Sequence, residues 1–263
     1  MKSATLLGLG ALALALSGSA MAAPFINGGF EDGNTNGWVT GGADRGGISN
    51  TSLNPDNALP GGSLYTGDST RSAIIGAGSV DPVLGSLLGS TVYSGNYSYR
   101  IEDTRSGGYA SAISQHVQNY TDGSIFFAWK AVLENGGHDE SESALFKVVL
   151  RDDTTDTVLI SRDYDAGLTG VGVDSRFSSS GDLFYTPLWQ IEQLTIDAAL
   201  SGHDFTLSLL AADCEWSGHT GYAYLDGFGA VLPPSGRVPL PGTLALMSLG
   251  LAGLGAMRKR RQA

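Results

Sequence analysis

The sequence has little charge, few basic residues and a single cysteine. Only 16% of its 263 residues are charged, and 15 Lys and Arg stand against 26 Asp and Glu, for a net charge of −11 at pH 7. This shortage of basic side chains argues against a phosphate-binding surface, so we expect no nucleic-acid partner. The lone Cys214 cannot form an intramolecular disulfide. The fold must therefore depend on its core.

Familiar catalytic motifs are also missing. The serines show no G-x-S-x-G pattern, the glycines form no phosphate-binding loop, and the four histidines show no zinc-binding spacing. Cys214 and His219 are close in sequence, but their acidic surroundings oppose a thiolate, which favours a buried or loop cysteine over a nucleophile. His138 lies in an acidic segment that we expect to be solvated. We predict that the protein is not an enzyme. A glycoside hydrolase is the open alternative, because its paired carboxylates have no fixed spacing in sequence.

The N terminus has the three parts of a secretory signal peptide over residues 1–22. Lys2 provides the positive charge, residues 6–16 form a small apolar segment, and residues 20–22 read Ala-Met-Ala, the usual cleavage pattern. We predict export by a Sec-type signal and cleavage after Ala22, with Ala23 as the neighbouring alternative.

The C terminus combines a linker, a short motif, an apolar run and a basic cluster. The linker spans residues 233–237, and the apolar run spans 244–257. The motif consists of Val238, Pro239, Leu240, Pro241, Gly242 and Thr243, and the cluster of Arg258, Lys259, Arg260 and Arg261. The apolar run is short for a membrane-spanning helix, but the cations after it would stay on the cytoplasmic side. We therefore expect a transient inner-membrane anchor, with a permanent anchor as the alternative.

This arrangement over residues 238–263 resembles the PEP-CTERM sorting signal of Gram-negative bacteria. The resemblance implies processing by an exosortase and delivery to the cell surface or the extracellular matrix, in a family associated with exopolysaccharide and biofilm. Leu240 stands where the family usually has Glu, which leaves cleavage of the tail in question. Without both ends the chain keeps ten Lys and Arg and all 26 acidic residues, a net charge of −16. Such a surface favours divalent cations and repels anionic polymers at low salt.

Residues 23–232 are predicted to form one all-β domain. The 38 glycines suit short strands joined by turns. Residues 124–133 alternate with period two, and further strands are predicted at 145–150, 158–162, 190–196, 204–211 and 221–231. Residues 41–89 are predicted to be long loops with one or two short strands. A short helix at 82–88 is the one helical candidate.

Three segments resemble the galactose-binding-like and carbohydrate-binding-module jelly rolls. They are residues 27–33 with Gly37 and Trp38, residues 200–212, and residues 222–228. The resemblance implies an antiparallel two-sheet β-sandwich. It also implies a structural Ca²⁺ bound by Glu31 on the first strand and Asp226 on the last, because hard cations prefer oxygen ligands. The alternative is that both are ordinary turn and edge residues.

Sugar binding is the function that the aromatic residues favour. Tyr222 and Tyr224 are predicted to alternate onto one face of the last strand together with Asp226 and Phe228, and Trp216 lies in a polar loop. We predict a carbohydrate site at Trp216, Tyr222 and Tyr224, although most aromatic residues of a sandwich belong to its core. The hypothesis is a secreted protein that binds extracellular polysaccharide. The alternatives are a structural matrix component without a sugar site and a matrix glycan hydrolase.

Overall fold

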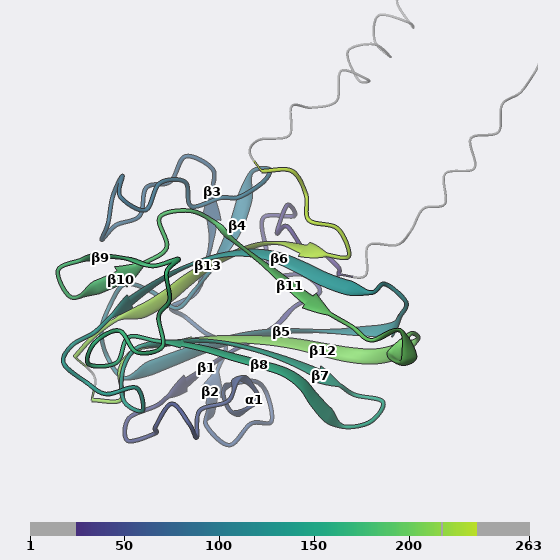
Figure 1. Ribbon diagram of the computed structural model, residues 1–263, viewed down its shortest axis with the longest axis horizontal. Helices are drawn as coiled ribbons and strands as arrows, with labels where there is room; N and C mark the ends of the chain where they lie inside the picture. Colours follow the sequence, from purple (N-terminus) through teal and green to yellow (C-terminus); the bar gives the residue numbers. More distant parts are fainter. Residues whose placement is uncertain (1–24, 217, 236–263) are drawn as a thin grey trace, which may run out of the picture.

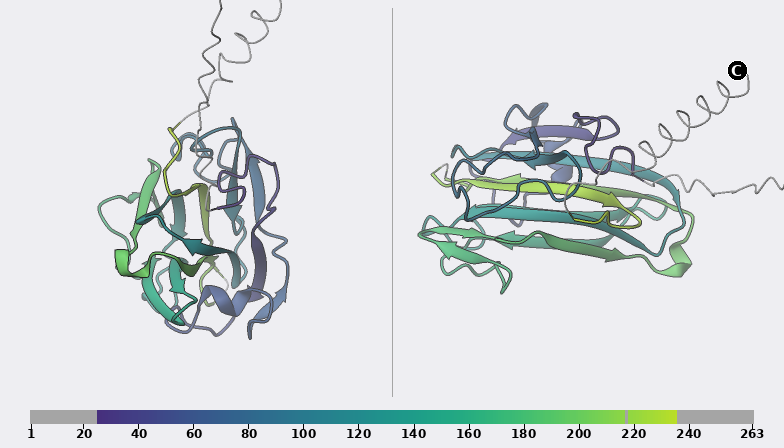
Figure 2. Two further views of the ribbon diagram at one scale, coloured as in Figure 1. Left: turned by 90° about the vertical axis from the view of Figure 1, so that its right-hand side faces the viewer. Right: turned by 90° about the horizontal axis from the view of Figure 1, so that it is seen from above.

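The computed structural model describes residues 25–216 and 218–235, in which antiparallel strands form two facing sheets (Figure 1). The strands run along the long axis of the domain, as the right-hand view of Figure 2 shows. This architecture confirms the all-β, two-sheet sandwich expected from the sequence. The predicted signal peptide (1–22), the motif at 238–243 and the basic cluster at 258–261 lie outside the described residues.

The first sheet has six strands in the described residues. In spatial order they are β2 (Tyr65–Gly67), β1 (Val39–Asp44), β5 (Tyr109–Tyr120), β12 (His203–Ala212), β7 (Leu145–Asp152) and β8 (Thr157–Asp165). β5, β12 and β7 pair over most of their lengths, and a polar turn at 153–156 joins β7 to β8. This hairpin is the one predicted from the sequence.

The second sheet has seven strands in the same part of the chain. Its path runs through β3 (Ala73–Gly76), β4 (Tyr97–Ile101), β13 (Gly221–Gly229), β6 (Ser124–Glu134), β10 (Leu183–Tyr185) and β9 (Ser178–Ser180), and β11 (Gln190–Thr195) pairs with β6. β13 pairs with β6 from Gly221 opposite Leu133 to Gly229 opposite Phe126. The start of β13 therefore lies beside the end of β6.

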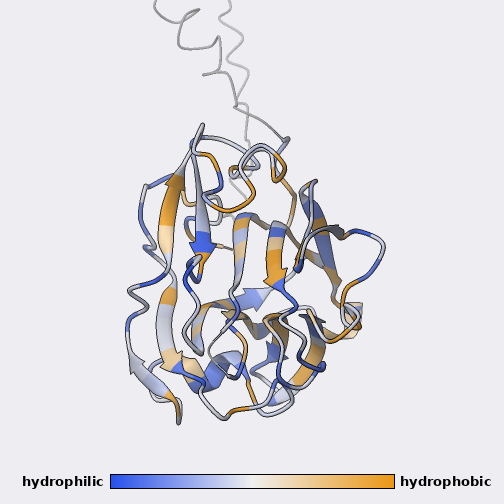
Figure 3. Cartoon of the chain, turned by 90° about the vertical axis from the view of Figure 1, so that its left-hand side faces the viewer, coloured by the Kyte–Doolittle hydropathy of each residue, from blue (hydrophilic) through white to orange (hydrophobic). Residues whose placement is uncertain are grey.

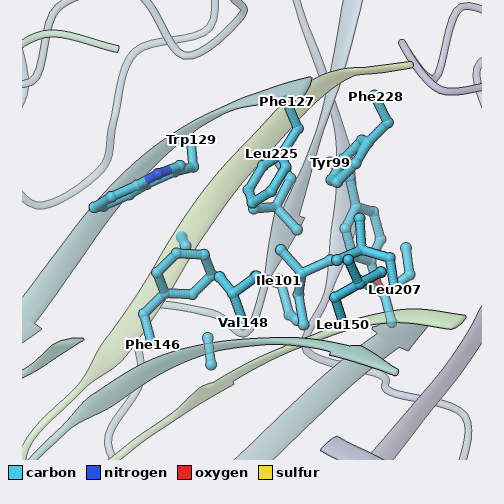
Figure 4. Close-up of a cluster of buried hydrophobic side chains, with 14 of the residues drawn as sticks. Tyr99, Ile101, Phe127, Trp129, Phe146, Val148, Leu150, Leu207, Leu225 and Phe228 are labelled. Atoms are coloured by element: carbon cyan, nitrogen blue, oxygen red, sulfur yellow. The ribbon is translucent and has the colours of Figure 1, made fainter. Parts of the chain in front are cut away.

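The main core lies between the two sheets because period-two alternation sends every second side chain inward. Trp129 and Phe127 of β6 meet Phe146 and Val148 of β7 there (Figure 4), and all four are fully buried. The hydropathy colouring of Figure 3 shows hydrophobic segments along the strands. At roughly 1.5–3 kcal/mol for each large apolar side chain, this burial is the main stabilising contribution of a chain that has no intramolecular disulfide.

Long segments cover the outer faces of both sheets. Residues 45–64, which include α1 (Pro55–Ala58), bring Leu53 and Ala58 against the first sheet. Residues 77–95 bring Leu84 and Leu88 against the second. The predicted loop region 41–89 thus contains most of β1 as well as β2, β3 and α1, and it contributes to two smaller apolar clusters in addition to the main core.

Two details of the sequence-based prediction were wrong, the helix at 82–88 and the placement of Glu31 on the first strand, since residue 31 lies in a turn before β1. Residues 82–88 form turns instead of a helix, because the Asp81 side chain accepts hydrogen bonds from the backbone N–H groups of Val83 and Leu84. The short helix is α1, where Asn54 caps the N terminus and Pro55 occupies the first turn. In residues 25–216 and 218–235, no helix is both long and apolar enough to cross a membrane.

Candidate functional site

Glu31 is held against the start of β4 by backbone hydrogen bonds. Its Oε1 accepts from the N–H groups of Asn96 and Tyr97 at 2.9 and 3.0 Å, and its Oε2 accepts from the Asn96 side chain at 3.2 Å. Gly95 makes this approach possible. Its φ is +69°, and a Cβ there would lie 2.3 Å from Oε1 of Glu31.

Asp226 lies on β13 under the segment that covers the second sheet. Its Oδ2 accepts hydrogen bonds from the N–H groups of Tyr93 and Ser94 at 2.9 and 3.0 Å, whereas its buried Oδ1 has no hydrogen-bond partner. Burial, with a smaller contribution from the nearby charge of Glu31, raises the pKa of this carboxyl to about 7. An unpartnered buried carboxylate oxygen is costly, so this position is a candidate for binding a proton or a cation.

The two predicted calcium ligands therefore lie close together. A Cβ on Gly29 would be 3.7 Å from both Oδ1 of Asp226 and Cγ of Glu31, so both side chains approach the same glycine. Carboxylate oxygens are the ligands that Ca²⁺ prefers. The donor set and the unpartnered Oδ1 fit a calcium ion, which Asp226 would bind through Oδ1 and Glu31 through its carboxylate.

Tyr222 and Tyr224 are not available to a ligand in this structure, contrary to the predicted sugar site. Their exposed fractions are 0% and 1%. Both hydroxyls donate hydrogen bonds to Asp81, at 3.0 and 2.8 Å, and thereby fix the covering segment on the second sheet. Phe228 does not share their face, because a bulge between Asp226 and Gly229 turns it into the main core, where it stacks on Phe127.

Trp216, the preferred sugar-stacking residue, is on the surface with 58% of its area exposed. Backbone hydrogen bonds restrain the loop that carries it. The N–H of Cys214 donates to the carbonyl of His219 at 2.9 Å, and the N–H of Glu215 donates to the carbonyl of Glu142 at 2.8 Å. The loop after β12 is thus attached to the loop after β6, and the indole ring projects from a restrained backbone.

A second aromatic candidate was missed in the sequence. Gly76, Ala77, Asn96 and Tyr97 line a surface cleft of 310 Å³. Asn96 and Tyr97 are also the residues whose backbone binds Glu31, so the cleft adjoins the candidate calcium site. No motif marks Tyr97, because its place in a cleft depends on the pairing of β3 with β4.

Two buried carboxyls, Glu102 and Asp213, flank Arg71. Its Nη1 lies 3.3 Å from Oε1 of Glu102 and 3.0 Å from Oδ2 of Asp213, and neither carboxyl side chain has exposed surface. Burial raises the pKa of Glu102 to about 7 and that of Asp213 to about 8. Shifted carboxyl pKa values are typical of glycosidase acids. Here no substrate can reach the groups, so we interpret the cluster as structural.

The C-terminal tail provides the identification. Residues 237–261 match the family profile of the PEP-CTERM protein-sorting motif. The chain carries a PEP-CTERM motif. The match includes the predicted motif at 238–243 and the basic cluster at 258–261, although Leu240 replaces the usual Glu. A PEP-CTERM motif indicates an exported protein that is sorted to the cell surface.

Solved structures similar to the domain are distant. The carbohydrate-binding module TmCBM61, solved in complex with β-1,4-galactotriose, has 12% identity and a TM-score of 0.44 over 79% of this chain and 96% of that one. CBM28, a module specific for non-crystalline cellulose, has 11% identity and a TM-score of 0.38 over 78% and 92%. The K1 adhesin domain of Lys-gingipain from Porphyromonas gingivalis has 10% identity and a TM-score of 0.35 over 75% and 92%. No curated protein matches the chain.

Proposed function

We propose that the protein is an exported, non-enzymatic module that binds extracellular polysaccharide after an exosortase has processed its PEP-CTERM tail. The observation that carries the proposal is the exposed ring of Trp216, 58% of whose area is accessible. The support is that the loop of Trp216, which backbone hydrogen bonds restrain, presents a flat apolar ring with a polar N–H to the solvent. Sugar rings have apolar faces that stack on indole.

The surroundings of Trp216 suit the rest of a sugar. Glu215 lies in the same loop, and its carboxylate can accept hydrogen bonds from hydroxyl groups. The net charge of −16 for residues 23–237 disfavours anionic polymers at low salt. We therefore expect neutral polysaccharides to bind better than uronic-acid polymers, with a difference that shrinks as salt is added.

Calorimetric titration of the purified exported protein with the host's extracellular polysaccharide tests this function. We expect saturable binding that Trp216→Ala weakens about tenfold or more, as truncation of an aromatic anchor does. Trp189→Phe is the matched control, because Trp189 is only partly exposed and its indole N–H already donates to the carbonyl of Ser90. Equal affinities of the wild type and Trp216→Ala would contradict the assignment.

Two further arms separate the alternatives. Tyr97→Ala tests the cleft. Loss of sugar binding in Tyr97→Ala but not in Trp216→Ala would place the sugar site at the other end of the domain. Absence of any binding would favour a structural matrix component. New reducing ends on the polysaccharide would favour a hydrolase and overturn the non-enzymatic function.

We also propose that Glu31 and Asp226 bind a structural Ca²⁺. The support is the unpartnered Oδ1 of buried Asp226 and its closeness to the Glu31 carboxylate. The ion would link the first described segment to β13 and offset the cost of two neighbouring negative charges.

A further inference from the structure

A second group of potential ligands lies at the opposite end of β13 from Asp226. Nε2 of His138 is 3.1 Å from Nδ1 of His219, and Sγ of Cys214 is 3.4 Å from the same Nδ1. The ligand atoms of all three side chains lie within 4.8 Å of one another. Cys214 is fully buried, and the two histidines are partly buried.

The two separations from Nδ1 of His219 are close to those between ligands of one metal ion. Bond lengths of about 2.0–2.1 Å to nitrogen and about 2.3 Å to sulfur, at tetrahedral angles, place two nitrogens about 3.3 Å apart and a nitrogen about 3.6 Å from a sulfur. We propose that His138, Cys214 and His219 bind a thiophilic transition-metal ion, with Zn²⁺ as the ion that fits best. Three protein ligands leave one tetrahedral position for water or an external ligand.

The surroundings prepare each ligand for a metal. Nδ1 of His138 lies 3.5 Å from Oε2 of Glu142, and a histidine whose Nδ1–H faces a carboxylate presents its Nε2 lone pair to the metal. The N–H of Gly218 donates to Sγ of Cys214 at 3.2 Å, which stabilises negative charge on the sulfur. Gly136 leaves room for the ring of His219, because a Cβ there would lie 2.1 Å from Nδ1.

A buried cation lies close to Cys214. Arg45 is fully buried. Its Nη1 donates to the carbonyl of Asp213 at 2.7 Å, next to Cys214 in the chain. A metal-bound thiolate of Cys214 would therefore lie near a positive charge.

The metal would join loops from both halves of the sandwich. Residues 135–144 connect β6 of the second sheet to β7 of the first, and residues 213–220 connect β12 of the first to β13 of the second. The ion would provide the cross-link that a lone cysteine cannot provide through a disulfide, and it would hold the loop of Trp216. The proposed metal site does not depend on the proposed sugar binding, because its test measures metal binding alone.

The test is a titration of the purified, chelator-treated protein with Co²⁺ alone and then Zn²⁺ alone, in excess Ca²⁺ to occupy carboxylate sites. We expect one equivalent of Co²⁺ with a thiolate-to-metal charge-transfer band and tetrahedral ligand-field bands, and displacement by Zn²⁺. Cys214→Ser should abolish the charge-transfer band. His138→Asn, at a partly exposed loop position, should lower affinity even if the buried Cys214 variant folds poorly.

Matched variants separate ligands from bystanders. Glu142→Gln should weaken binding by about 10–100-fold, because it removes the carboxylate partner of a ligating histidine while the ligands remain. His116→Asn should leave binding unchanged, because that ring contacts Asp153 on the outer face of the first sheet. Two results would overturn the proposal: no stoichiometric metal binding, or metal binding that lacks the charge-transfer band and persists in His138→Asn. Either result would leave a hydrogen-bonded Cys–His–His group.

Discussion

The two ends of β13 carry contrasting sets of potential ligands. Near its end, Asp226 and Glu31 offer only carboxylate oxygens, and just before its start Cys214 and His219 join His138 in a nitrogen and sulfur set. Oxygen donors favour hard ions such as Ca²⁺, and thiolate with imidazole favours Zn²⁺. One strand can therefore be anchored at both ends by different ions, each tied to a different part of the chain.

The largest expected effect concerns the oxygen end. Ca²⁺ at a thousand times its Kd should stabilise the purified wild-type protein by about 4 kcal/mol, and Asp226→Asn should remove this gain because it removes the charged ligand. This gain in stability is measured by thermal unfolding with chelator, with Ca²⁺ and with Zn²⁺. His219→Asn is the matched control, since it should keep the Ca²⁺ response. If Ca²⁺ still stabilised Asp226→Asn, Asp226 would not be a calcium ligand, and the contrast between the two ends of β13 would not hold.

The pH dependence of the calcium response sharpens the same contrast. Because burial raises the pKa of Asp226 to about 7 from an ordinary 3.8, the ion-free folded state holds this proton more tightly than the unfolded state. The ion-free protein should thus lose stability as the pH rises from about 4 to 7. Ca²⁺ needs the ionised carboxylate, so its stabilisation should grow over this range. A calcium-induced shift in Tm that is independent of pH would contradict this linkage.

A smaller effect is expected at Glu102, which belongs to neither ion site. Burial raises its pKa from 4.5 to about 7, so its contribution to stability is largest below pH 4.5 and is lost as the pH rises through 7. Glu102→Gln should flatten the fall in Tm over that range, with Ca²⁺ and Zn²⁺ responses unchanged. An identical pH profile in the wild type and the variant would show that Glu102 does not titrate as its burial implies.

The smallest expected effect separates backbone strain from ligand placement. Gly95→Ala puts a Cβ against Glu31 at φ +69°, whereas Gly78→Ala meets only the strain of φ +87° with no atom within 4 Å. Each should cost about 1–3 kcal/mol of folding free energy. Only Gly95→Ala should also weaken Ca²⁺ binding, which calorimetric titration measures. Equal calcium affinities of Gly95→Ala and Gly78→Ala would show that Glu31 does not bind the ion.

Several of the longer strands of both sheets could be predicted because their side chains alternate clearly. The predicted strand at 124–133 is β6, and the one at 221–231 corresponds to β13. β5 was missed, since small residues such as Ala110, Ser111 and Ala112 occupy both of its faces and weaken the period-two pattern. Its central place in the first sheet comes from pairing with β1 and β12, which is not a local property.

The site residues divide in the same way. The pairing of Glu31 with Asp226 was proposed from motifs at the two ends of the domain, whereas the role of Gly95 in admitting the Glu31 carboxylate depends on the fold. His138 is far from Cys214 and His219 in sequence, so no spacing motif exists. The register of β13 on β6, with Gly221 opposite Leu133, brings the flanking loops together. The burial of Tyr222 and Tyr224 could not be predicted, because the covering segment, residues 77–95, has no regular pattern of apolar residues.

The most direct test is a crystal structure grown with Ca²⁺ and Zn²⁺ together, with anomalous difference maps on both sides of the zinc edge. We predict a peak among His138, Cys214 and His219 that vanishes below the edge, and a second ion beside Oδ1 of Asp226 whose signal does not change across it. Zinc beside Asp226, or no ion at either end of β13, would contradict the account.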